Sequence, residues 1–256
     1  MTILAEPLDE AKRIFESSSR RQVVLRLLGG IAVKLRCPSA QHSGLKRKYL
    51  DLDFVGLSKQ SREIRKLFEE MGYEPRARFN AMMGGKRLIY NDLVNKRRVD
   101  IFLDVFEMSH KFDFRRRLFH DDYTLPLADL MATKLQIVQI NDKDFRDVVS
   151  LFVDHELGSE DGEFINGQYI SDLCANDWGI YKTFTINLAK VLVALQGYGL
   201  ETSQAELVSS RVKKLVKMIE DAPKTLGWKL RARVGERVLW YELPEGDKLV
   251  VTDSSG

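Results

Sequence analysis

The sequence predicts an α+β protein whose strands gather in the first half and whose helices dominate the second. Three observations carry this prediction. Short apolar strand patterns alternate with helical patterns up to about residue 120, helical spacing prevails from Pro126 to about Glu220, and the last part alternates apolar with basic residues. Gly, Ser and acidic residues cluster between helices near residues 156–168, and we therefore predict two domains, residues 1–157 and residues 158–256.

The elements of the first half follow from apolar periodicity and from the residues that end each pattern. In order they are a helix over 8–18, a strand over 23–28 that runs into Gly29-Gly30, a helix over 31–36 limited by Pro38, a loop with basic residues over 39–49, a strand beginning near Asp51, a helix over 61–71 ended by Gly72, and a hairpin of strands over 86–91 and 97–106.

The second half reads as helices that are broken near residues 158–167 and 197–201. Residues 228–234 alternate apolar and basic side chains, and Gly235-Glu236 can form a tight turn before a second alternating stretch over 237–243. This pattern predicts a C-terminal β-hairpin with a basic face of Lys229, Arg231 and Arg233. Such a face is either a solvated surface or a site for a polyanion such as RNA.

Composition excludes several classes of protein. With 44% hydrophobic and 30% charged residues in 256, the chain has the balance of a soluble globular protein. A net charge of +3 is too small to indicate a nucleic-acid partner by itself. Cys37 and Cys174 form no paired motif, and no apolar run is long enough to span a membrane. We expect a cytoplasmic protein with no membrane partner.

The most informative motif is a pair of carboxylates on one strand. Asp51 and Asp53 alternate with apolar residues, so an extended strand places both on one face. Adjacent carboxylates repel unless a cation lies between them. Gly29 and Gly30, between a strand and a helix, offer close backbone approach and free N–H groups to a phosphate. Together these residues indicate metal-dependent phosphoryl or nucleotidyl transfer, although an Asp-x-Asp pair can also be merely solvated.

A third carboxylate would come from the next strand along the chain. Asp100 and Asp104 share a strand face, but they lie about 13 Å apart, so only one can join Asp51 and Asp53. The spacing alone leaves both possible. Three carboxylates on neighbouring strands suit hard Mg²⁺ ions, which prefer oxygen ligands.

Lys134 interrupts the apolar stripe of a predicted helix. A lysine in that position either binds an anion such as a triphosphate or pairs with a carboxylate, for which Asp129 and Asp144 are candidates. The spacing favours neither. The chain's tryptophans, Trp178, Trp228 and Trp240, we interpret as core or domain-packing residues.

These motifs, in this order, resemble the DNA polymerase β superfamily of nucleotidyltransferases. The matching segments are Gly29-Gly30-Ile31-Ala32, Asp51-Leu52-Asp53, Val99-Asp100-Ile101, the stretch Asp129 to Leu135, and Lys143 to Asp147. The last two more narrowly resemble the minimal nucleotidyltransferases of abortive-infection toxin systems. The resemblance covers roughly residues 20–155.

The resemblance implies a small mixed β-sheet flanked by helices, with Mg²⁺ at Asp51, Asp53 and Asp100. It also implies an NTP held by Gly29, Gly30 and Lys134, and it favours Asp100 over Asp104. Two departures stand out: Ile31 occupies a position where many members carry a phosphate-binding serine, and the interval between Gly30 and Asp51 is long.

We therefore expect an enzyme that transfers a nucleoside monophosphate from an NTP to an acceptor hydroxyl, with Mg²⁺ as cofactor. The acceptor could be RNA, protein or a small molecule, and the sequence does not name it. Two rival hypotheses are an inactive module of the same fold that senses nucleotides or binds a partner, and an RNA-binding protein without transfer activity. The clustered aspartates favour the enzyme.

Overall fold

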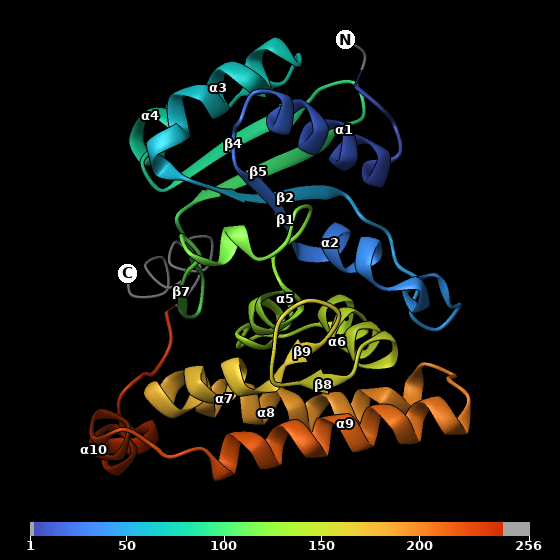
Figure 1. Ribbon diagram of the computed structural model, residues 1–256, viewed down its shortest axis with the longest axis vertical. Coiled ribbons are helices and arrows are strands. Elements are labelled where there is room, and N and C mark those ends of the chain that lie inside the picture. The colour runs from blue at the N-terminus through green and yellow to red at the C-terminus, as the bar shows by residue number, and fades with distance from the viewer. Residues whose placement is uncertain (1–2, 243–256) are drawn as a thin grey trace, which may run out of the picture.

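The computed structural model describes residues 3–242 and confirms the predicted α+β class. Figure 1 shows a β-sheet with α1, α3 and α4 on one side and α2, α5 and α6 on the other, beyond which α7, α8 and α9 form a further helical layer. The helices are α1 (Pro7–Arg20), α2 (Gly29–Arg36), α3 (Ser61–Glu70), α4 (Ala77–Met83), α5 (Leu127–Leu135), α6 (Asp142–Asp154), α7 (Gly167–Asn176), α8 (Trp178–Ala194), α9 (Thr202–Asp221) and α10 (Leu226–Val234).

The main sheet has five strands in the order β1-β2-β5-β4-β3 and is mixed, as the resemblance implies. Only the central pair, β2 and β5, is parallel. Its strands are β1 (Leu25–Leu28), β2 (Asp51–Gly56), β3 (Glu74–Pro75), β4 (Arg87–Asp92) and β5 (Arg97–Leu103). Two further sheets have two strands each. One pairs β6 (Val105–Glu107) and β7 (Lys111–Asp113), and the other pairs β8 (Leu157–Gly158) and β9 (Ile165–Asn166).

Most predicted elements are confirmed where the periodicity was long. The predicted helix over 61–71 is α3, whose apolar stripe of Ile64, Leu67 and Phe68 is buried under the sheet. The predicted hairpin is β4 and β5, which pair antiparallel. Helix α4, β3 and the β6–β7 hairpin were not predicted from the sequence, because each is too short to carry a clear period.

The predicted C-terminal β-hairpin is wrong over the described residues. Residues 226–234 form the helix α10 instead, and Gly235–Arg237 continues as a single 3₁₀ turn. Thr225 caps the helix by accepting a hydrogen bond from the Trp228 N–H, and Gly235 ends it with a positive φ. The capping residues, rather than the period-two pattern, therefore determine the secondary structure of residues 226–234. The continuous basic face is lost too, because the Arg231 guanidinium lies over the Trp178 ring.

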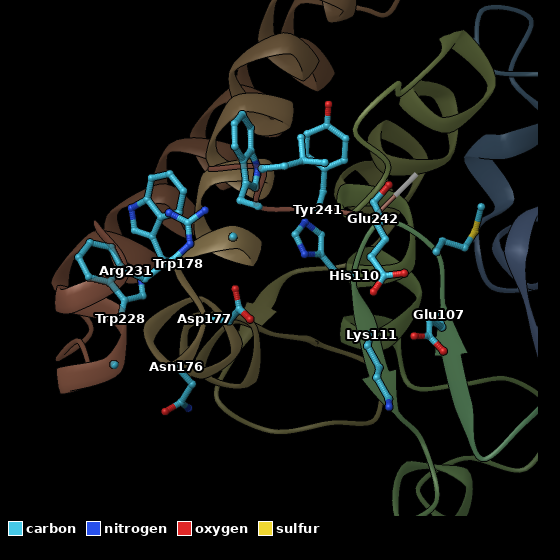
Figure 2. Close-up of a pocket in the computed structure, with 16 residues that line it drawn as sticks. Glu107, His110, Lys111, Asn176, Asp177, Trp178, Trp228, Arg231, Tyr241 and Glu242 are labelled. Carbon is cyan, nitrogen blue, oxygen red and sulfur yellow. The ribbon is translucent and has the colours of Figure 1, made fainter. Parts of the chain in front are cut away.

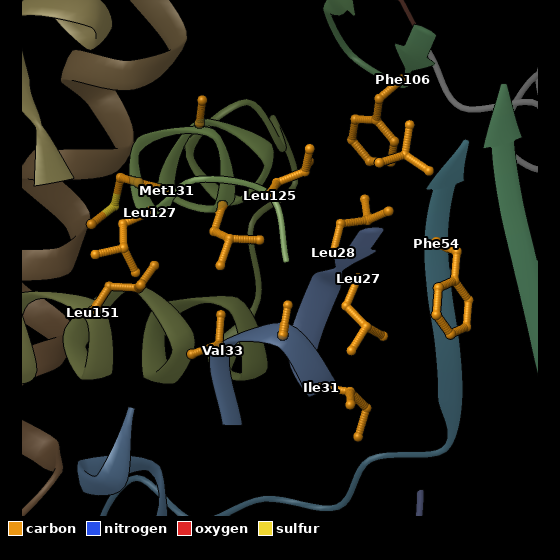
Figure 3. Close-up of a cluster of buried hydrophobic side chains, with 14 of the residues drawn as sticks. Leu27, Leu28, Ile31, Val33, Phe54, Phe106, Leu125, Leu127, Met131 and Leu151 are labelled. Atoms are coloured by element: carbon orange, nitrogen blue, oxygen red, sulfur yellow. The ribbon is translucent and has the colours of Figure 1, made fainter. Parts of the chain in front are cut away.

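One hydrophobic core runs from the sheet through α5 and α6 to α7, α8 and α9. Figure 3 shows part of this core, which extends from Phe54 of β2 past Leu28 of β1 to Met131 of α5 and Leu151 of α6. Every residue of α5 is buried, because this helix lies between the sheet and the outer helices. The division at residues 157 and 158 stays a prediction. No helix within residues 3–242 is long and apolar enough to cross a membrane.

The basic loop before β2 is tightly packed against the helical layer. Leu45 is buried, and Gly44 lies directly against the backbone of Tyr198, after α8. A Cβ built on Gly44 would be 1.6 Å from the Tyr198 carbonyl oxygen, a distance that no local adjustment can absorb. The loop therefore joins the sheet unit to the outer helices through a backbone contact that only glycine permits.

We predict that Gly44→Ala lowers the free energy of unfolding by about 1–3 kcal/mol, because the new methyl group forces loop and carbonyl apart. The matched control is Gly85→Ala, where an added Cβ meets nothing within 4 Å. Urea unfolding followed by circular dichroism measures both variants. Equal stability of the two would show that the loop does not pack in this way.

Candidate functional site

The predicted carboxylates come together on the face of the sheet that looks toward the helical layer. Asp53 of β2 lies directly opposite Asp100 of the parallel strand β5, and Asp51 lies two residues before Asp53. Because side chains alternate along a strand, all three lie on one face. Among residues 3–242, neither Asp51 nor Asp53 makes a hydrogen bond or an ion pair through its carboxylate.

Gly29 allows Asp53 to lie against the start of α2. Leu28 pairs with Asp53 in the antiparallel β1–β2 ladder, and Gly29 follows at once with a left-handed φ of 71°. A Cβ there would be 2.4 Å from Asp53 Oδ2. No side chain caps this end of α2, so its first N–H groups and the positive end of its dipole face the carboxylate cluster. The turn thus places unbonded backbone N–H groups next to the Asp53 carboxylate.

Electrostatics make Asp53 the most perturbed carboxyl in the cluster. Burial first, and then the neighbouring charges of Asp100 and Asp51, raise the pKa of Asp53 to about 7, although Lys134 acts in the opposite direction. A carboxylate that is half-buried, unpaired and surrounded by like charge is destabilised until a cation approaches it. This is the arrangement that a divalent metal relieves.

Asp100 differs from Asp51 and Asp53 because two arginines hold it. Arg87 Nη2 lies 2.7 Å from Asp100 Oδ1, and Arg98 Nε lies 2.7 Å from Asp100 Oδ2. Both arginines come from the sheet itself, Arg87 from β4 and Arg98 from β5. Our sequence reasoning missed both, although Arg98 stands two residues before Asp100 and therefore shares its strand face.

The structure also separates Asp104 from the cluster. Asp104 follows the end of β5 with a φ of 62°, and its Oδ1 accepts a hydrogen bond from the Ser58 N–H at 2.9 Å. The Ser58 hydroxyl donates to the other carboxylate oxygen. Of the two candidates for the third carboxylate, only Asp100 lies beside Asp53.

Lys134 lies in a buried ion-pair network. Its Nζ is 3.0 Å from Asp144 Oδ1 and 2.8 Å from Asp147 Oδ2, so the pairing alternative is realised, whereas Asp129 pairs with Arg117. Burial alone would lower the pKa of Lys134, but the charges of Asp147 and Asp144 outweigh it and raise that pKa. The ammonium group is therefore fully charged at neutral pH.

Arg47 completes this network and was not singled out by our sequence reasoning. Its Nε and Nη2 donate to the two oxygens of Asp147 at 2.8 and 2.7 Å. The guanidinium lies across Gly30, because a Cβ built there would be 1.8 Å from Arg47 Nη2, and it stacks on Tyr49 at 4.2 Å. The basic loop before β2 thus places a cation at the start of α2.

These residues fit a hard divalent cation in part. Within residues 3–242 no group of three or more His, Cys, Asp or Glu side chains is assembled around one metal position. The unpaired oxygens of Asp51 and Asp53 have the donor chemistry that Mg²⁺ prefers, and their mutual repulsion demands a cation. Asp100 is instead neutralised by Arg87 and Arg98.

Comparisons with known proteins do not assign a function to this site. No protein-family model matches the chain, and no curated protein matches it. Among solved structures, the chain is similar to the lincomycin-bound lincosamide antibiotic adenylyltransferase LnuA, with a TM-score of 0.42, 14% identity, and coverage of 56% of this chain and 94% of that one. It is also similar to the antibiotic-resistance factor ANT(2'')-Ia, with a TM-score of 0.41, 13% identity, and coverage of 66% and 93%. At this level of similarity neither alignment assigns a function.

We predict that Asp53→Asn stabilises the metal-free protein at pH 8 by about 1–2 kcal/mol and has no such effect at pH 4. The folded-state pKa of Asp53, about 7, lies above the ordinary value of 3.8. Its ionisation therefore costs stability progressively as pH rises between these values, and asparagine removes that cost. Urea unfolding in EDTA at both pH values measures the effect. An identical difference at pH 4 and pH 8 would contradict it.

We predict that Lys134→Met lowers the free energy of unfolding by about 3 kcal/mol, because it leaves Asp144 and Asp147 buried with one cation fewer. Thermal unfolding at pH 7.5 provides the measurement. Lys190→Met is the matched control, since Lys190 is exposed and makes no ion pair within the described residues. A melting temperature unchanged by Lys134→Met would rule out a structural ion pair.

Proposed function

We propose that this protein is a nucleotidyltransferase that moves a nucleoside monophosphate from an NTP to an acceptor hydroxyl. One observation carries the proposal: two unpaired carboxylates, Asp51 and Asp53, share one strand face, and Asp53 lies against the uncapped N-terminus of α2. A cation site and an anion site in contact are what a metal-bound triphosphate requires. The ordered motifs that resemble the DNA polymerase β superfamily support the same chemistry, and the narrower resemblance to toxin-system enzymes stays a prediction.

The triphosphate end of the site consists of backbone N–H groups and one guanidinium. The N–H groups at Gly29 and Gly30 open α2, and Arg47 lies over Gly30. Lys134 does not have a free ammonium group, because Asp144 and Asp147 hold it. In this proposal Lys134 acts through Asp147, which it shares with Arg47, and so positions the Arg47 guanidinium above the helix start.

The transfer exchanges one bond at phosphorus for another. The acceptor oxygen bonds to the α-phosphorus, the bond from that phosphorus to the bridging oxygen breaks, and pyrophosphate leaves. The hydroxyl proton passes to a carboxylate, for which Asp100 is our candidate. Bound Mg²⁺ would supply charge neutralisation for the phosphates, and Asp51 and Asp53 would hold it.

The arginine contacts of Asp100 favour a second candidate function. A carboxylate paired with both Arg87 and Arg98 is not available as a base until they move away. A module that binds NTP and Mg²⁺ without transferring a nucleotide would tolerate this pairing. The two functions differ in one respect: both bind the nucleotide, and only the enzyme releases pyrophosphate.

We predict that Asp53→Asn reduces Mg²⁺-dependent pyrophosphate release by about 100-fold or more, since it removes a charge on which metal and phosphate depend. The assay supplies each α-labelled NTP with Mg²⁺ and separate RNA, protein and metabolite fractions, and then locates the label. Asp104→Asn is the matched control and is expected to stay within about threefold of the wild type, because Asp104 contacts Ser58 instead.

Calorimetric titration of Mg²⁺ with each NTP separates the two candidates. Nucleotide binding without label transfer to any fraction would favour the sensing module. Full transfer activity in Asp53→Asn would overturn the assignment of the site itself.

A further inference from the structure

Two hollows lie end to end between α7 and the β6–β7 hairpin, away from the carboxylate cluster. The first has a volume of about 510 Å³ and the second about 690 Å³. Lys111 of β7 lines both. On the opposite wall, Leu173 lines one and Asn176 the other, and these residues lie three apart on the same face of α7. The two hollows therefore adjoin at Lys111 beside α7, and we call them together the α7 groove.

One end of the α7 groove is aromatic. Trp178, Trp228, Trp240 and Tyr241 line it, so all three tryptophans of the chain gather around one hollow. Trp178 is buried, which agrees with its interpretation as a packing residue, whereas Trp228 and Trp240 are half-buried beside the hollow. The Trp178 and Trp240 rings meet edge to face with centroids 6.0 Å apart, and Trp240 and Tyr241 do so at 5.3 Å. Arg231 lies over the Trp178 ring and Lys224 over the Trp228 ring, so the half-buried rings of Trp240 and Tyr241 are the ones that can stack with a ligand.

The same end also carries hydrogen-bond acceptors. Figure 2 shows the Asp177 side chain between the Trp178 side of the hollow and the His110 side, with Glu107 and Glu242 across from it. Asp177 Oδ1 accepts the Ile180 N–H at the start of α8. Its second oxygen makes no hydrogen bond with the described residues. Aromatic faces beside carboxylate acceptors suit a planar ring that bears amino groups.

The other end of the α7 groove is cationic. Arg115 pairs with Asp113, and Arg117 pairs with Asp129 and Asp161. Lys111 and Arg116, in contrast, are exposed and form no ion pair or side-chain hydrogen bond with any residue from 3 to 242. Two unpaired cations lining a hollow suit phosphate groups.

We propose that the α7 groove binds single-stranded nucleic acid, with bases at the tryptophan end and phosphates at Lys111 and Arg116. Each hollow alone has the size of a small-molecule site, and the two together hold more than one nucleotide. Single strands are recognised by aromatic stacking platforms beside a cationic track, because their base faces are free. The second carboxylate oxygen of Asp177 at the aromatic end selects bases with amino groups over uracil and thymine. The proposal does not depend on nucleotide transfer, because none of Asp51, Asp53 and Asp100 lines either hollow.

Intrinsic tryptophan fluorescence tests this directly, because every tryptophan lines the groove. Titration of the full chain with a single-stranded oligoadenylate, without NTP or Mg²⁺, is expected to quench the emission. Polyuridylate of equal length should bind more weakly, and affinity should fall as salt rises. Equal affinity for AMP and the oligomer would show that the groove binds a mononucleotide and not a strand. Quenching by an acidic peptide instead of the oligomer would show that its ligand is a protein. Either result would overturn the proposal, as would the absence of any change at low salt.

Paired variants locate the binding. Lys111→Gln with Arg116→Gln should weaken oligoadenylate binding about tenfold and flatten its salt dependence, since two phosphate contacts are lost. Lys213→Gln with Lys214→Gln removes the same charge from exposed positions on α9 outside the groove and should leave the affinity unchanged. Tyr241→Leu should weaken binding, and Tyr241→Phe should preserve it, because stacking needs the ring. Equal losses in both charge pairs would mean nonspecific attraction and would overturn the groove as the site.

Discussion

The carboxylate of Asp147 is the contact on which the rest of the site depends. Asp147 belongs to α6, and its carboxylate forms ion pairs with Arg47, from the loop before β2, and with Lys134 of α5. Three segments that are distant in the sequence are thereby held together in a buried position. Burial alone would raise the pKa of Asp147, but Lys134 and Arg47 lower it, so the charge persists. Loss of either cation would leave a charge in the interior without full compensation, which makes the arrangement intolerant of change.

The carboxylates on the sheet face that looks toward this network are, in contrast, only partly neutralised. Asp51 and Asp53 are not neutralised by the described part of the chain, whereas Asp100 is neutralised by Arg87 and Arg98. A fold that needed only stability would not place three carboxylates in neighbouring positions on adjacent strands. The protein therefore tolerates local repulsion at this point and offsets it through the large apolar core on both sides of the sheet. Unfavourable local energy of this kind is typical of a functional site.

The sequence predicted the parts of the site that lie on regular elements. Strand alternation placed Asp51 and Asp53 on one face, and the apolar stripe identified Lys134 as exceptional, although the roles of these residues stay predictions. It could not predict Arg47, because a loop has no period from which the direction of a side chain follows. Spacing alone could not choose between Asp100 and Asp104 either, since the choice depends on the register of β2 against β5, and only the family resemblance favoured Asp100. The segment over 228–234 was misread because alternating residues also suit a helix when Thr225 and Gly235 cap it.

Charge balance explains why Lys134 is better placed to organise the site than to bind phosphate. Lys134 and Arg47 carry two positive charges, and Asp144 and Asp147 carry two negative ones, so the buried network is neutral as it stands. An arriving triphosphate would find no net positive charge there. In the proposed function the compensation would come from the uncapped start of α2, from Arg87 and Arg98, which carry two positive charges against the single negative charge of Asp100, and from a cation held by Asp51 and Asp53. Nucleotide and metal are therefore expected to bind together, each supplying the charge that the other lacks.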